Sequence, residues 1–140
     1  MSALGNVHTL SLYSTLISDV SALGNVHTLD LSFCTGITDV SALGNVHTLN
    51  LSKDFYTFKA LYQTLNLDEL TSIGITDVSA LGNVHTLNLS CCLGITDVSA
   101  LGNVHTLDLS FCTGITDVSA LVNVHTLNLL FCVGITDVSA

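Results

Sequence analysis

The chain has 140 residues, of which 11 are acidic and 2 are lysines, so its formal net charge is -9. Because nucleic acids and anionic membranes are bound through Lys and Arg side chains that face phosphate, this balance argues against both kinds of partner. There is no apolar run of roughly 18 residues and no signal-peptide pattern at the start, so we expect a soluble, cytoplasmic protein.

The tetrapeptide VHTL recurs along the chain and defines its period. Its histidines are separated by 19, 20, 38, 20 and 20 residues, at His8, His27, His47, His85, His105 and His125. The unit is therefore twenty residues long, and the gap of 38 is predicted to hold two units, the second keeping only QTLNL (63–67) and GITDV (74–78). We predict one domain over residues 1–140 with about seven units, irregular at 52–74 and without visible caps.

One regular unit shows how the coil is built. Its apolar positions are Val26, Leu29, Leu31, Cys34, Ile37, Val40 and Leu43. Only Leu29 and Leu31 have the two-residue spacing of a strand, which leaves Thr28 and Asp30 on the opposite face. The remaining spacings of three describe a turning coil that cannot enclose its own apolar residues. The units must therefore stack on each other as a solenoid.

The segment after each strand, GITDVSALGN, is predicted to make two corners. Gly36 is expected to take a positive φ at the first corner. Thr38 or Asp39 is expected to cap a short helical or 3₁₀ turn opposite the strand. Gly44 and Asn45, which tolerate left-handed conformations, are expected to turn the chain back into the next strand.

The stretch VHTLDLSFCTGITD, from Val26 to Asp39, resembles the cysteine-containing leucine-rich repeat LxxLxLxxCxxITD, and ITDVSALGNV is similar to internalin-type repeats. The resemblance implies an α/β solenoid, mostly β, with a parallel sheet on one face and short 3₁₀ or helical turns on the other. It also implies that the thiol in the cysteine slot points inward and hydrogen-bonds backbone. Protein recognition is the commonest work of that family.

The cysteines favour a reduced core. Four of the five, Cys34, Cys92, Cys112 and Cys132, occupy the same slot of the repeat. We expect buried free thiols, which suit the cytosol. A disulfide ladder between neighbouring coils is the alternative.

The repeated polar residues give only weak evidence for a metal site or a catalytic site. The six histidines are expected to form a surface column, and metal binding is the alternative, although a metal needs three or four converging ligands. Cys34 should face the core and His27 the solvent, so a nucleophile–base pair is not predicted. Asp39 and its equivalents are expected to act as caps rather than as a calcium ladder, because the pattern GGxGxD is missing. We predict no catalytic residue, no metal ligand and no cofactor.

The outward strand positions and the irregular segment are the predicted binding face. A flat threonine array could also suit ice, but the companion column contains Asp. An apolar ridge is expected from Phe33, Phe111, Phe131 and Cys91. The candidate partner-binding residues are Thr28, Asp30, Thr48, Asn50, Lys53, Phe55, Tyr56, Phe58, Thr86, Asn88, Thr106 and Asp108.

The predicted function is a non-enzymatic protein–protein interaction module that binds a protein partner through its strand face. The alternative is a structural, self-assembling repeat or an uncapped fragment of a larger repeat protein. Aromatic residues are frequent in binding hot spots, which favours a site at Phe55 and Tyr56, whereas a decayed repeat would use them to fill a widened core. End-to-end self-association is a further expectation, since Leu130 makes the last unit more apolar than the others.

Overall fold

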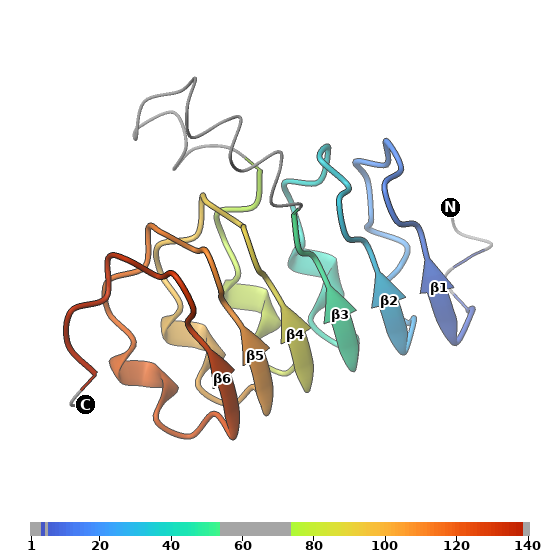
Figure 1. Ribbon diagram of the computed structural model, residues 1–140. Helices are drawn as coiled ribbons and strands as arrows, with labels where there is room; N and C mark the ends of the chain where they lie inside the picture. Colours follow the sequence, from blue (N-terminus) through green and yellow to red (C-terminus); the bar gives the residue numbers. More distant parts are fainter. Residues whose placement is uncertain (1–3, 5, 54–73, 139–140) are drawn as a thin grey trace.

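The computed structural model describes residues 4, 6–53 and 74–138. In this part of the chain the coils stack side by side, and each contributes one short strand to a single parallel sheet (Figure 1). The sheet has six strands in chain order: β1 (Thr9–Ser11), β2 (Thr28–Asp30), β3 (Thr48–Asn50), β4 (Thr86–Asn88), β5 (Thr106–Asp108) and β6 (Thr126–Asn128). The predicted leucine-rich-repeat solenoid, with 3₁₀ turns opposite the sheet, is confirmed.

Equivalent positions of successive strands lie side by side. Thr28 pairs with Thr48, Leu29 with Leu49, and the same register holds from β1 to β6. The central leucine of β2, Leu29, is buried, and so is Leu31, which directly follows the strand. The period of the sequence thus becomes straight columns of identical side chains.

The fourth unit, predicted to keep QTLNL at residues 63–67, lies outside the described residues. In the part of the chain that the structure describes, β3 and β4 are direct neighbours, with Thr48 paired to Thr86. Close stacking requires glycine at one corner: a Cβ on Gly44 would lie 2.5 Å from the carbonyl oxygen of Ala80. In the sequence, the altered unit has Ala60, Leu61, Tyr62 and Gln63 where the regular unit has Gly-Asn-Val-His, so it lacks this glycine.

The side opposite the sheet carries 3₁₀ turns. They are η2 (Ser41–Leu43), η3 (Ser79–Leu81), η4 (Ser99–Leu101) and η5 (Ser119–Leu121). Asp39, rather than Thr38, stabilises the start of its turn, because its carboxylate accepts a hydrogen bond from the amide of Ser41 at 2.9 Å. The same bond forms at Asp19, Asp77, Asp97 and Asp117.

One continuous core runs along the axis of the coils. Its leucine, valine, isoleucine and cysteine side chains come from every described coil. The thiols lie inside: Cys34 donates to the carbonyl of Leu12 at 3.0 Å, and Cys112 donates to that of Leu89 at 3.1 Å. Cys92 and Cys132 make the equivalent bonds. The inward direction that the resemblance implied for these four thiols is therefore confirmed, and no disulfide joins them in the structure.

The corners differ from the prediction. The left-handed residue at the first corner is not Gly36 but the residue before the cysteine slot, with φ of 62° at Phe33 and 61° at Phe111. Among the described glycines only Gly74 has a positive φ. Gly44 has an ordinary helical conformation, with φ -64° and ψ -20°. Glycine is needed there because the next coil's backbone comes too close for a side chain.

Candidate binding surface

The outer face of the sheet presents three parallel columns. The first is the histidine that precedes each strand, the second is the first strand residue, threonine, and the third is the last strand residue, which is Asp or Asn from β2 onward. The histidines are exposed, whereas the threonines and Asx residues of β2 to β5 are half-buried. The surface is therefore polar, regular and continuous over the described strands.

The histidine column is a stack of aromatic rings. Neighbouring ring centroids are 4.5 Å apart between His8 and His27 and 4.6 Å apart in each later pair, with interplanar angles of 8° to 13°. Each Nδ1 is 3.0 to 3.2 Å from the Oγ1 of the following threonine. Partial burial, followed by the neighbouring rings of His27 and His85, lowers the pKa of His47. The rings and threonines thus hold each other in fixed orientations.

The Asx column has a second role that the sequence analysis missed. The Oδ1 of Asp30 accepts hydrogen bonds from the amide and the hydroxyl of Ser32, at 2.9 Å and 2.6 Å. Asn50, Asn88, Asp108 and Asn128 each accept the corresponding amide hydrogen bond at 2.9 to 3.0 Å. This bond stabilises the turn that leaves the strand, as Asx side chains commonly do. The signal was present in the sequence as an Asx-Leu-Ser pattern.

The predicted ridge forms only in part. Phe111 stacks on Phe131, with ring centroids 4.8 Å apart, and Phe33 contacts Tyr13 at 5.0 Å. Cys91, however, is buried, with 6% of its surface exposed. It therefore interrupts the ridge as a surface feature, although it occupies the same left-handed backbone position.

The irregular segment is described only at its first residues. The Lys53 ammonium donates a hydrogen bond to the carbonyl oxygen of Cys34 at 2.8 Å, and burial lowers its pKa. Lys53 is thus directed into the coil beneath it rather than toward a partner. The other candidates of this segment, Phe55, Tyr56 and Phe58, lie outside the described residues.

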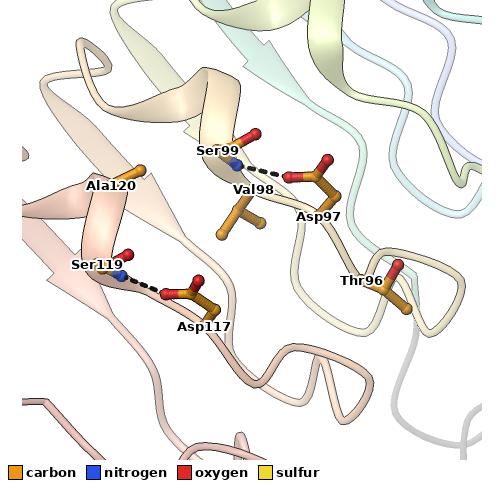
Figure 2. Close-up of a pocket in the computed structure, with 7 residues that line it drawn as sticks. All are labelled: Thr96, Asp97, Val98, Ser99, Asp117, Ser119 and Ala120. Atoms are coloured by element: carbon orange, nitrogen blue, oxygen red, sulfur yellow. Dashed lines mark hydrogen bonds between the residues drawn. The ribbon is translucent and has the colours of Figure 1, made fainter.

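The opposite side of the solenoid has shallow hollows between successive coils. Figure 2 shows one of them, where Asp97 and Asp117 each accept a hydrogen bond from the serine two residues later. The hydroxyl of Ser99, and then its amide, hold the pKa of Asp97 below its ordinary value, while the neighbouring carboxylates raise it by less. The caps therefore outweigh the repulsion between stacked carboxylates, as their predicted role requires.

Neither nucleophilic nor metal chemistry finds support in the described residues. Burial raises the pKa of Cys92 to about 12 and that of Cys112 well above its ordinary value, which disfavours the reactive thiolate. Within residues 4, 6–53 and 74–138, no group of three or more His, Cys, Asp or Glu side chains is arranged to hold a metal ion. No helix in the same residues is long and apolar enough to cross a membrane.

The comparisons with known proteins give structural resemblances alone. No protein-family model matches the sequence, and no curated protein matches it. An internalin, inlF, from Listeria monocytogenes matches 92% of this chain at 20% identity with a TM-score of 0.43, and this chain covers 50% of it. Internalin C2 from Listeria monocytogenes matches 92% of this chain at 20% identity with a TM-score of 0.35, and 84% of it is covered.

A third solved structure is the functional domain of InlJ from Listeria monocytogenes, which includes a cysteine ladder. It matches 85% of this chain at 19% identity with a TM-score of 0.34, and this chain covers 33% of it. The chain therefore spans half or less of the length of two of these three proteins. The parallel strands on one side and the 3₁₀ turns on the other have, by themselves, the leucine-rich-repeat architecture.

Proposed function

We propose that this chain is a non-enzymatic protein–protein interaction module that binds its partner through the outer face of the sheet. The observation that carries the proposal is the ordered polar array on β2 to β5. Each histidine is held by a threonine, and each Asx residue is held by its own turn. Side chains that are already ordered lose less conformational entropy on binding, so such a surface favours recognition.

The array also suggests the chemistry of the partner. Asp30 on β2 and Asp108 on β5 enclose two neutral residues, Asn50 and Asn88. With strands about 4.8 Å apart, the two carboxylates are separated by about 14 Å along the sheet. A protein segment that crosses the strands with basic groups at that separation would match this surface. An acidic segment would be repelled by it and by the net charge of -9.

The test compares the two faces with the same substitution. Thr86→Arg with Thr106→Arg changes the sheet face, and Thr96→Arg with Thr116→Arg changes exposed positions on the opposite side. Immobilised wild-type chain and both double variants are used to capture partners, with thermal unfolding as a check on folding. We expect the sheet-face variant to lose a partner that the wild type and the opposite-face variant retain. Equal retention by both variants would contradict the proposal.

We further propose that the module works in a reducing compartment such as the cytoplasm. Five buried cysteines, none of them joined in a disulfide, support this, because an oxidising compartment would favour disulfides between neighbouring thiols. Alkylation of the denatured protein immediately after cell lysis would report five free thiols. Recovery of disulfide-linked cysteines would contradict the proposed location.

A further inference from the structure

The histidine column can change the charge of the sheet face near neutral pH. Its six rings are exposed, and histidine is the side chain that ordinarily gains a proton between pH 8 and pH 5. Among the outward positions of β1 to β6 the charged residues are Asp30 and Asp108. Each lies three residues after a ring of the column, His27 and His105 respectively. Protonation of the column therefore adds positive charge to a face that otherwise carries two carboxylates.

The other charges of the described chain do not face the rings. Lys53, the only lysine among the described residues, donates to a backbone carbonyl of the coil beneath it. Asp39 and its equivalents lie on the side of the coils opposite the sheet (Figure 1). Partial burial, followed by the charges of His27 and His85, lowers the pKa of His47. The charge of the column is therefore controlled by pH and by the neighbouring rings.

The rings are close enough for a proton on one of them to affect the next. Neighbouring ring centroids are 4.5 to 4.6 Å apart. Two positive charges at this distance repel each other, so a proton on one ring disfavours a proton on the next by about two- to fivefold, depending on salt. Alternate rings are about twice as far apart, and their repulsion is weaker. Protons are therefore expected to occupy alternate rings first.

The bond to threonine can hold each ring in place in both protonation states. A hydroxyl group both donates and accepts, so Oγ1 can donate to a neutral Nδ1 or accept a hydrogen bond from a protonated one. The distance between these two atoms is 3.0 to 3.2 Å in all six pairs. Protonation thus changes the charge of the face without requiring the coils to rearrange.

Three protonated rings are enough to reverse the charge of the face, because they carry one more charge than Asp30 and Asp108 together. His27 lies about 10 Å from Asp30 along the chain, since the two are separated by three residues of about 3.3 Å each. This distance is close to the screening length of about 8–10 Å in physiological salt and well within the roughly 30 Å at 0.01 M salt. A basic group bound at Asp30 is therefore repelled by protonated rings, most strongly at low salt.

We propose that the histidine column makes the outer face of the sheet pH-sensitive, so that its affinity for a basic protein segment falls as alternate rings gain protons below about pH 6.5. The inference rests on the proposed binding face and adds a means of regulation to it. At neutral pH the two carboxylates attract the basic segment. In mild acid the face is positive, so a basic segment is repelled and an acidic one is attracted.

Two synthetic peptides with blocked ends test the sign of this change. The basic peptide, Lys-Ser-Ser-Ser-Lys, has about 14 Å between its lysines when extended, and Glu-Ser-Ser-Ser-Glu is its matched control. NMR titration of the 140-residue chain gives their Kd values at pH 7.5 and pH 5.5 in about 10 mM salt. As pH falls, the Kd of the basic peptide should rise at least threefold and that of the acidic peptide should fall. Both changes should shrink in about 150 mM salt.

A histidine variant identifies the groups responsible. His27→Gln with His47→Gln, His85→Gln and His105→Gln removes the inner rings of the column and keeps both carboxylates. For the basic peptide, the ratio of the Kd at pH 5.5 to the Kd at pH 7.5 should then fall toward one. Thermal unfolding at both pH values checks that the variant and the wild type are folded.

A carboxylate variant separates this inference from the proposed function. If the basic peptide does not bind at pH 7.5, or binds Asp30→Asn with Asp108→Asn as tightly as the wild type, the proposed partner chemistry fails and the inference with it. If its Kd is the same at both pH values, or rises equally in the glutamine variant, the binding face stands and the role of the histidines is overturned. A Kd that rises for both peptides would also overturn it, because a reversal of charge affects them in opposite directions.

Discussion

Substituting Gly102 by alanine tests whether close stacking, rather than a turn conformation, requires glycine at this corner. Its φ of -63° and ψ of -19° suit any residue. By reducing the freedom of the unfolded chain, Gly→Ala at such a position ordinarily stabilises a protein by about 0.4–1 kcal/mol. Here the added Cβ would lie 2.5 Å from the carbonyl oxygen of Ala120. Overpacking of this kind costs about 1–3 kcal/mol, so we expect a net loss of about 1–2 kcal/mol.

Thermal and urea unfolding followed by circular dichroism measure this change, and the expected fall in Tm is about 3–8 °C. Val122→Ala places the same side chain in the same slot of the coil that contains β6, and because surface substitutions are usually within about 0.5 kcal/mol it should be near neutral. If Gly102→Ala is as stable as the wild type, the Ala120 carbonyl moves aside easily. Close stacking would then not be the reason for glycine at this corner.

Three further predictions concern the core, the caps and pH. Cys112→Ala removes the thiol that donates to the Leu89 carbonyl, which keeps the hydrogen bond from the Cys92 amide at 3.1 Å. The free energy of unfolding should fall by about 0.5–1.5 kcal/mol in urea titrations. Asp97→Ala removes the acceptor for the Ser99 amide and should lower Tm near neutral pH. Since the folded-state pKa of Asp97 is lowered, its contribution is present above the ordinary value and lost as pH falls through the folded value, so the difference from wild type should shrink in acid. The pKa of His47 is also lowered, so the unfolded chain binds more protons, and Tm should fall as pH drops from about 6.5.

Each of these predictions has a matched control. Cys112→Ser keeps a donor, though a shorter one, and should lose less stability than the alanine variant. Asp97→Asn keeps an acceptor oxygen without a titrating group, so it should stay folded while the acid dependence at this position disappears. His47→Gln should reduce the dependence between pH 7 and pH 5.5. A wild-type Tm that rises over this interval would show that other groups outweigh His47.

The period and the inward spacing of Leu29 and Leu31 were sufficient to predict the solenoid and its sheet. They determine which residues must be buried together, and stacking is the only way for a coil of twenty residues to bury them. The corners could not be predicted in the same way. Gly44 and Gly36 looked like turn residues, because glycine is the usual solution for a positive φ. The close approach that requires Gly44 is made by Ala80, 36 residues later, and becomes visible only when the coils are stacked.

The positions that are identical in every repeat are explained by packing. The positions that differ between repeats are therefore the ones to consider for function. The Asx residue is common to β2–β6 because its Oδ1 is needed by the turn, and either Asp or Asn supplies that oxygen. The fold therefore does not determine the choice between Asp and Asn, and this choice sets the charge of the proposed binding face at Asp30 and Asp108. Val122 is likewise compatible with its own coil, although the inner coils need glycine in that slot because the alanine carbonyl of the next coil lies close. Positions at which a substitution leaves the coil intact and changes only its surface are therefore the ones at which the proposed binding is best tested.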